Sequence, residues 1–126
     1  MIRILVDTNV IIDYFKNPTA ETTSIFEQNE IATCGVIITE LLRGAKSVKE
    51  AEKLKAALEC FDYLDFEKSD WIEIAELFAK FKKSGITVPF QDGIISYLAI
   101  KNNCIIWTKD NHFKIIQAVI PVLELL

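Results

Sequence analysis

Four carboxylates in this sequence have the residue type and the placement of a divalent-metal site: Asp7, Glu40, Asp92 and Asp110. We refer to them as the four acids. Clustered carboxylates repel one another, and their pKa values rise unless a cation lies between them. Mg²⁺ prefers oxygen ligands, and one or two bound ions can orient a phosphodiester, generate hydroxide from water and stabilise the leaving oxygen. The four acids therefore favour metal-dependent hydrolysis, provided that the fold brings them together.

Two of the four acids are expected at one edge of a sheet. Asp7 directly follows an apolar segment, 2–6, that is typical of a buried strand, and Asp110 comes three residues after a second predicted strand, 104–107. In open parallel sheets, binding sites form where the carboxyl ends of the strands meet. The order of the elements alone therefore predicts that Asp7 and Asp110 are neighbours.

The other two acids lie on predicted helices. Asp92 opens a helix over 91–102, so it also belongs near a loop. Glu40 lies on a helix over 37–45 whose neighbouring positions are apolar, and a carboxylate among so many buried neighbours needs a partner or a metal. The order of the elements does not by itself place these two acids beside the first two.

Each of the four acids also has an ordinary structural alternative. Asp7 and Asp92 could cap helices, since Asp is a good N-cap residue. Asp110 could form an Asx-turn before Asn111, and Glu40 could face solvent on a two-sided helix. Periodicity and spacing alone indicate an α/β domain and leave the metal site as one interpretation of the acids.

Strand-like and helix-like segments alternate along the chain, which is typical of a parallel sheet with helices on both faces. Thr19 and Ser69 are predicted to be N-caps, and Pro121 indicates that the last strand lies at an edge of the sheet. The expected strands are 2–6, 31–34, 61–66, 104–107 and 119–125, and the expected helices are 8–15, 19–30, 37–45, 47–60, 70–83, 91–102 and 110–117.

Burial is predicted for two sets of side chains. The helix after Ser69 repeats apolar residues at helical spacing, which indicates a buried face. The three cysteines are far apart in apolar stretches, which favours buried free thiols over a disulfide framework or a zinc site. The expected buried face consists of Trp71, Ile74, Ala75, Phe78 and Phe81, and the cysteines are Cys34, Cys60 and Cys104.

The composition is that of an ordinary globular chain. Its 126 residues predict a single domain over 1–126. The apolar run before Asp7 is too short for a signal-peptide core, and no stretch approaches the roughly 20 apolar residues of a membrane span, so a cytoplasmic protein is expected. The net charge of −4 lacks the basic excess of many nucleic-acid binders. Without the four acids, however, 14 acidic residues would face 14 basic ones, and bound cations would offset the same deficit.

Four segments around the four acids resemble the motifs of the PIN-domain family, particularly the VapC-type toxins of toxin–antitoxin pairs. The segments occur in the family's order and at family-like spacing, from the first residues of the chain nearly to the last. Four motifs in register are far more specific than any one of them. The segments are 4–10 (ILVDTNV), 39–45 (TELLRGA), 89–95 (PFQDGII) and 106–113 (IWTKDNHF).

The resemblance implies a fold, an activity and partners. The fold is an α/β three-layer α/β/α sandwich with a parallel five-stranded sheet. The activity is that of an endoribonuclease dependent on Mg²⁺ or Mn²⁺, the toxin of a toxin–antitoxin pair, in which the four acids are catalytic metal ligands. Thr108 would help to hold metal-bound water, and Asn9 would order the first loop. The implied partners are RNA as substrate, a cognate antitoxin and a second copy of the chain in a homodimer.

We expect in-line attack of activated water on the RNA phosphodiester, which leaves a 5′-phosphate and a 3′-hydroxyl. The competing ribonuclease scheme needs a pair of histidines as base and acid, and His112 is the only histidine in the sequence. His112 itself is expected to be a loop residue that packs near Phe113. Gly93, which stands where the family more often has alanine, is expected to loosen the first turn of its helix.

Basic residues concentrate in two sets, which are either solvated helix faces or surfaces that follow the phosphates of a nucleic acid. Arg43 is the best candidate for substrate binding because it lies one turn from Glu40, although its guanidinium could instead bind a carboxylate of the antitoxin. Lys46 belongs to the same set. The two sets are Arg43, Lys46, Lys49, Lys53 and Lys55, and Lys80, Lys82 and Lys83.

Three other functions are alternatives to a toxin ribonuclease. A receiver-like phospho-switch module has a similar length, but it needs a second acid beside Asp7, where Thr8 and Asn9 stand. A PIN domain that acts in RNA processing or partner binding, without a toxin role, stays open at the level of the sequence. A nucleotide-binding enzyme is not favoured, because the four glycines form no phosphate loop.

Overall fold

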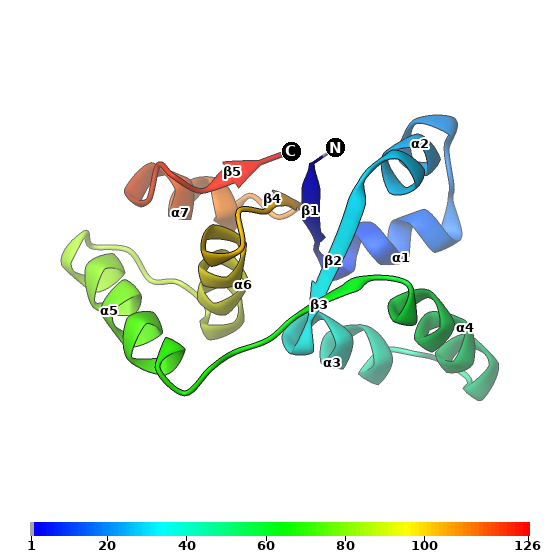
Figure 1. The fold of residues 1–126 in the computed structure, drawn as a ribbon, viewed down its shortest axis with the longest axis horizontal. Helices are drawn as coiled ribbons and strands as arrows, with labels where there is room; N and C mark the ends of the chain where they lie inside the picture. The colour runs from blue at the N-terminus through cyan, green and yellow to red at the C-terminus, as the bar shows by residue number, and fades with distance from the viewer. Residues whose placement is uncertain (1) are drawn as a thin grey trace.

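The computed structural model describes residues 2–126, which form one five-stranded parallel sheet with helices on both faces (Figure 1). The α/β sandwich expected from the sequence is thus confirmed. The strands are β1 (Arg3–Val6), β2 (Glu30–Cys34), β3 (Asp62–Leu64), β4 (Ile105–Trp107) and β5 (Glu124–Leu125). The helices are α1 (Thr8–Lys16), α2 (Ala20–Gln28), α3 (Gly35–Arg43), α4 (Val48–Glu59), α5 (Asp70–Lys83), α6 (Phe90–Lys101) and α7 (His112–Val119). Within residues 2–126, no helix is long and apolar enough to cross a membrane.

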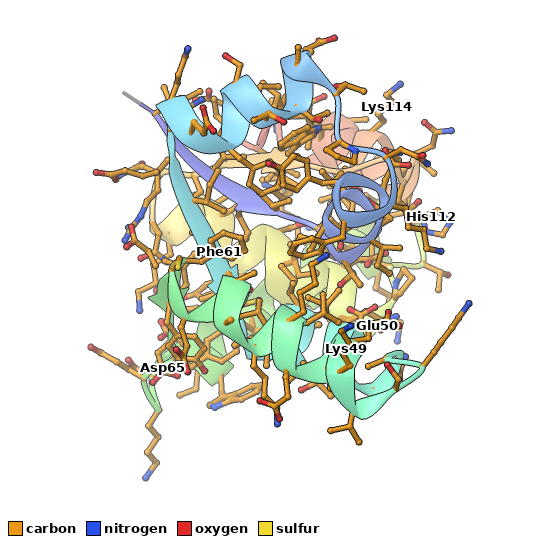
Figure 2. All side chains as sticks on the ribbon, turned by 90° about the vertical axis from the view of Figure 1, so that its right-hand side faces the viewer. Lys49, Glu50, Phe61, Asp65, His112 and Lys114 are labelled. Carbon is orange, nitrogen blue, oxygen red and sulfur yellow. The ribbon has the colours of Figure 1, made fainter. Side chains whose placement is uncertain are left out.

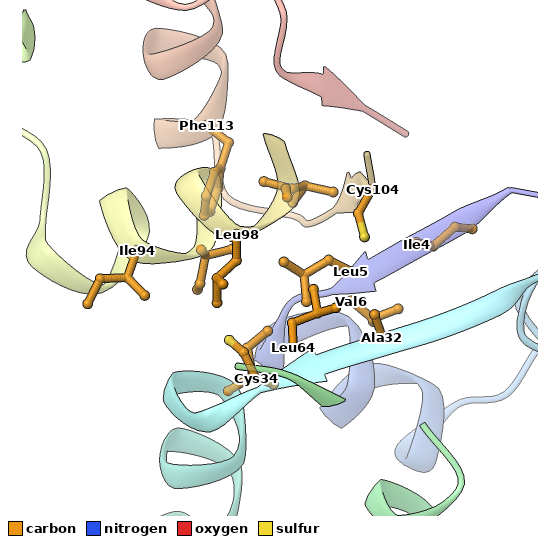
Figure 3. Close-up of a cluster of buried hydrophobic side chains, with 14 of the residues drawn as sticks. Ile4, Leu5, Val6, Ala32, Cys34, Leu64, Ile94, Leu98, Cys104 and Phe113 are labelled. Carbon is orange, nitrogen blue, oxygen red and sulfur yellow. The ribbon is translucent and has the colours of Figure 1, made fainter. Parts of the chain in front are cut away.

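The centre of the sheet is β1, whose residues Ile4, Leu5 and Val6 are fully buried. Leu5 lies opposite Ala32 of β2 on one side and Ile106 of β4 on the other. A strand covered by helices on both faces is apolar along its whole length rather than alternating, which explains the run at the start of the sequence. Figure 3 shows side chains of α6 and α7, among them Leu98 and Phe113, gathered over these strands.

The order of the strands is β3-β2-β1-β4-β5. The chain moves outward from β1 in one direction to β3 and then crosses to β4 on the other side of β1. Helices α1, α2 and α4 lie on one side of the sheet, and α5, α6 and α7 lie on the other (Figure 1). The crevice between β1 and β4, at their carboxyl ends, is therefore the switch point where α/β folds bind ligands.

Some predicted boundaries and caps are wrong, mostly where short segments compete with a neighbouring helix. The expected strand 119–125 is reduced to Glu124–Leu125 because α7 continues to Val119, although β5 is the edge strand as expected. The Thr19 cap is confirmed, since its hydroxyl accepts a hydrogen bond from the Thr22 N–H at 3.1 Å. Ser69 does not cap α5, because its own backbone is already helical.

Two burial predictions are confirmed only in part. Cys34 and Cys104 are buried as expected, whereas Cys60 is exposed because it lies just beyond the end of α4. On α5, Ile74 and Phe81 are buried as expected, whereas Trp71 and Ala75 are exposed. The buried stripe of α5 begins instead with Asp70, a carboxylate that the apolar pattern could not reveal.

Asp70 joins α5 to α6 through a polar cluster. Its side chain is 2% exposed, and the Lys101 ammonium lies 2.7 Å from both of its oxygens. The Tyr97 hydroxyl donates to Asp70 Oδ1 at 2.6 Å, and the Glu67 N–H donates to Oδ2 at 2.6 Å. The Lys101 ammonium first, and then the two donors, lower the pKa of Asp70 from 3.8 to about 2. This cluster fixes the helix that carries Asp92 against α5.

We expect Asp70→Asn to lower the Tm at pH 7 by roughly 5–10 °C, because it removes a buried carboxylate that pairs with Lys101 and accepts hydrogen bonds from Tyr97 and Glu67. The folded pKa of Asp70 lies below its unfolded value, so the stabilisation is present above about pH 4 and is lost as the pH falls toward 2. Thermal unfolding of both proteins between pH 2 and 7 measures this difference. Glu76→Gln, on the exposed face of α5, is the control. An equal loss in that variant would contradict the prediction.

Candidate active site

The loops after β1 and β4 bring Asp7 and Asp110 together, as the order of the elements predicts. The Asp7 N–H donates to the Trp107 carbonyl at 2.9 Å, which extends the pairing of the two strands into the loops. The Thr108 hydroxyl donates to Asp7 Oδ2 at 2.7 Å and accepts from the Asp110 N–H at 3.0 Å. One hydroxyl therefore sets the positions of both acids.

Asn9 also connects the two loops. Its side-chain amide donates to Asp7 Oδ2 at 3.4 Å, and its oxygen accepts from the Lys109 N–H at 3.2 Å. The expected ordering of the first loop by Asn9 thus has a structural basis, because the side chain holds Asp7 from one side and the β4 loop from the other.

Asp7 and Asp110 lie in this site and also have the ordinary structural roles that the sequence left open, a helix cap and an Asx-turn. Asp7 is the N-cap of α1, and its Oδ1 accepts from the Thr8 N–H at 2.8 Å. Asp110 Oδ1 accepts from the His112 N–H at 2.9 Å, which is the expected Asx-turn. The bonds to Asp7 use three of its roughly four acceptor positions, and Asp110 Oδ2 accepts no hydrogen bond from residues 2–126, so both carboxylates keep room for a further partner.

Asp92 differs from the first two acids because it has no capping role. Pro89 is the N-cap of α6, and Asp92 lies in the first turn, so the capping alternative is wrong. The residue is only 8% exposed. Among the residues that the structure describes, no group donates a hydrogen bond to its carboxylate. A buried carboxylate without a donor is costly unless it is neutralised or paired with a cation.

The pKa of Asp92 is raised by burial and, in part, by the charges of the other three acids. Burial is the largest cause that raises it, and the charges of Asp110, Asp7 and Glu40 raise it further. His112 lowers it, and the net result is a rise from 3.8 to about 6. The structure therefore places all four acids in one electrostatic neighbourhood.

Glu40 lies on α3, the helix that follows β2. Its side chain is half-buried, and its pKa is raised by burial and by Asp7, while Arg43 lowers it. It lines an open pocket of about 440 Å³ together with Gly35, Val36, Thr39, Arg43 and Gln91. The Glu40 carboxylate thus interacts electrostatically with Asp7 and is also accessible from solvent through the pocket.

The two predicted basic contacts lie in different places. Arg43 lines the Glu40 pocket, one helical turn from the carboxylate. Lys46 does not; it lines a separate groove together with Ile12, Phe15 and Glu50. The structure therefore supports a placement of Arg43 beside the acids and does not bring Lys46 to them.

The prediction for His112 is wrong. Its side chain is 59% exposed, and its Nδ1 lies 3.4 Å from Asp110 Oδ1 and 3.6 Å from Asp92 Oδ2. Phe113, which was expected to pack beside it, is fully buried in the core. The Asx-turn at Asp110 explains the difference, because it folds the chain back so that residue 112 begins α7 beside the acid. That turn was the signal in the sequence that could have placed His112 in the site.

Gly93 also has a different role from the one expected. A Cβ at this position would lie 2.2 Å from the Phe78 ring, so glycine provides room for that ring rather than loosening the helix. Phe78 in turn contacts Phe81 edge-on and stacks on Phe90, with ring centroids 5.7 and 5.6 Å away. The aromatic side chains of α5 thereby approach the turn of α6 that carries Asp92.

We expect Gly93→Ala to lower the free energy of unfolding by about 1–2 kcal/mol, because the Phe78 ring must move out of its packed position. Urea denaturation measures the loss. The double variant Gly93→Ala/Phe78→Leu should recover part of it, because the smaller side chain leaves space for the new methyl group. A single variant as stable as the natural chain would show that the ring moves without cost.

The residues of the site fit a divalent cation. Asp92, Asp110 and His112 each offer a ligand atom, and these atoms all lie within 4.8 Å of one another. The carboxylates of Asp7 and Glu40 add oxygen donors of the kind that Mg²⁺ and Mn²⁺ prefer. The buried, donor-free carboxylate of Asp92 gives the strongest indication, because a cation would supply the partner that the protein does not.

Comparisons with known proteins agree with this geometry. The family model of the PIN domain matches residues 4–119, a range that contains all four acids. Ribonuclease VapC1 of Methanocaldococcus jannaschii is 31% identical over 113 residues, which cover 89% of this chain and 79% of that protein. The receiver-like alternative is therefore wrong.

Solved structures show the same fold. VapBC2 from Rickettsia felis, bound to a DNA fragment from its promoter, contains a chain that superposes with a TM-score of 0.83 at 22% identity, over 99% of this chain and 98% of that one. DNA-bound VapBC from Salmonella typhimurium gives a TM-score of 0.83 at 20% identity, over 100% and 98% of the two chains. With its fold, its four acids and the match over residues 4–119 in agreement, this chain belongs to the PIN-domain family.

Proposed function

We propose that this protein is an endoribonuclease, the toxin of a toxin–antitoxin pair, and that it cleaves RNA with a divalent cation held by the four acids. The observation that carries the proposal is Asp92. It is a buried carboxylate to which no group of residues 2–126 donates a hydrogen bond, and its pKa is raised to about 6 by burial and by the three other acids. Such a group is unfavourable by itself and becomes favourable when a cation binds.

Each residue has a role in this proposal. Asp7, Asp92, Asp110 and Glu40 would hold the cation, which supplies, when bound, a Lewis acid that lowers the pKa of water and neutralises charge on the phosphate. Thr108 and Asn9 hold Asp7 in position through hydrogen bonds to Oδ2. The guanidinium of Arg43, beside the open pocket at Glu40, is placed to bind a phosphate of the RNA.

The chemistry of the products follows from the residues that the chain offers. A cleavage that uses the 2′-hydroxyl of RNA leaves a 2′,3′-cyclic phosphate, and the competing scheme uses a pair of histidines as base and acid. The chain has a single histidine, and that residue lies against two carboxylates. We therefore expect water to be the nucleophile and the products to carry a 5′-phosphate and a 3′-hydroxyl.

The relatives favour a toxin over other PIN-domain roles. The curated relative is named a ribonuclease, and the solved structures are VapBC complexes. We propose, on this basis, that a cognate antitoxin binds the chain and blocks the site. A homodimer stays a prediction, and size-exclusion chromatography with light scattering tests it.

The test of the function is RNA cleavage by the purified chain with Mg²⁺ or Mn²⁺. We expect cleavage that stops when a chelator is added and returns when the metal is restored. The Asp92→Asn protein, purified in the same way, controls for contaminating nucleases. Cleavage that survives both the chelator and the substitution, or 2′,3′-cyclic phosphate ends on the products, would overturn the proposal.

A further inference from the structure

His112 contributes the only imidazole to a site otherwise made of carboxylates. Its Nδ1 lies 3.4 Å from Asp110 Oδ1 and 3.6 Å from Asp92 Oδ2. The backbone N–H of the same residue donates to Asp110 Oδ1 at 2.9 Å, which fixes the start of α7 relative to this acid. The ring therefore faces the acids from a backbone position that is already held in place.

The two carboxylates beside His112 are not satisfied by other groups of the described chain. Asp92 is 8% exposed and receives no hydrogen bond, and Asp110 is joined to the protein mainly by its Asx-turn. The side chain of His112 is 59% exposed, and Figure 2 shows it at the edge of the molecule. A ligand that enters between the ring and the two acids would thus meet three converging donor atoms.

The spacing of these atoms suits one shared ion. Neighbouring ligands of an octahedral ion with bonds of 2.0–2.1 Å lie roughly 3 Å apart. The Nδ1–oxygen distances are 3.4 and 3.6 Å, and all three ligand atoms lie within 4.8 Å of one another. Small rotations of these side chains would therefore give all three atoms a place around the same cation.

We propose that His112 Nδ1 is a metal ligand in this site, together with Asp92 and Asp110, and that it makes the site selective for transition-metal ions such as Mn²⁺ over Mg²⁺. The inference rests on the proposed function, since it concerns the cation of the same site. Imidazole nitrogen suits transition metals, whereas Mg²⁺ takes oxygen ligands and keeps its waters. A purely carboxylate site would lack this preference.

The single histidine makes a direct test possible. The chain, freed of any histidine tag, is labelled with ¹⁵N-histidine, and its Mn²⁺ complex is measured by pulsed electron paramagnetic resonance. We expect a nitrogen coupling that changes from ¹⁴N to ¹⁵N with the label, which can only come from His112. A Mn²⁺ complex without this coupling would overturn the inference while leaving the proposed function intact. A chain that binds neither Mn²⁺ nor Mg²⁺ would overturn both.

Metal titration by calorimetry tests the selectivity. His112→Gln should raise the Kd for Mn²⁺ about tenfold or more and change the Kd for Mg²⁺ less than about threefold. Lys114→Gln is the matched control, because it removes an exposed residue on the same helix (Figure 2). Equal losses for both ions in His112→Gln would mean that the ring acts only through charge, and they would contradict the inference. Because the ring is 59% exposed, the substitution does not threaten folding.

Discussion

Replacing Asp92 with Asn is expected to make the metal-free protein more stable and to abolish most of its activity. At pH 7 in a chelator, the free energy of unfolding should rise by about 1–2 kcal/mol. With RNA and metal, kcat/KM should fall by roughly a thousandfold, which corresponds to about 4 kcal/mol of lost transition-state stabilisation. Both effects have the same origin, which is a carboxylate held among other carboxylates.

The stability effect follows from the pKa of Asp92. In the folded protein, burial and the charges of the other acids raise it from 3.8 to about 6. The folded state thus binds this proton more tightly than the unfolded chain does, so the group favours folding in the acid range, and that contribution is lost as the pH rises through 6. The shift corresponds to at most about 3 kcal/mol, and solvent at the open side of the site reduces the expected gain.

Urea denaturation in a chelator, between pH 2.5 and 8, measures the prediction. The difference between Asp92→Asn and the natural chain should be largest at pH 7 and above, and it should disappear only below the unfolded pKa of 3.8, where Asp92 carries its proton in both states. Glu59→Gln, at the exposed end of α4, removes the same charge outside the site. A gain that is equal in both variants, or independent of pH, would attribute the effect to net charge instead.

The sequence is most informative where local pattern decides the structure. The apolar run before Asp7 predicts β1, and the alternation of segments predicts the parallel sheet and the shared edge of Asp7 and Asp110. Glu40 and Asp92 were placed by family resemblance, because their positions depend on how α3 and α6 approach the sheet. No periodicity in the sequence encodes the distance between two helices.

Contacts between distant segments explain what could not be predicted. Asp70 was expected in the first turn of a helix, where an acid is favourable, but its burial depends on Lys101, which is 31 residues away. Gly93 was expected to loosen its helix, but the Phe78 ring fills the space that a side chain at this position would need. His112 was expected in a loop near Phe113, and a turn of the backbone directs it to the acids.

Thr108→Val is expected to weaken metal binding although it removes no ligand. The hydroxyl bridges both loops at the switch point, since it donates to Asp7 Oδ2 at 2.7 Å and accepts from the Asp110 N–H at 3.0 Å. Valine has nearly the same shape but removes both of these hydrogen bonds and leaves Asp7 Oδ2 only the longer one from Asn9. Removing a group that orients metal ligands typically costs 10–100-fold in affinity, and we expect about that loss for Mn²⁺.

Thr108→Ser provides the control that separates positioning from packing. Serine keeps the hydroxyl and loses the methyl group, so it should bind Mn²⁺ within about threefold of the natural chain, even if it is slightly less stable. Calorimetric titration of both variants with Mn²⁺, beside their urea denaturation, measures the two effects separately. If Thr108→Ser loses as much affinity as Thr108→Val, then the methyl group matters and the hydroxyl does not. If both keep full affinity, the two loops hold Asp7 and Asp110 without this bridge.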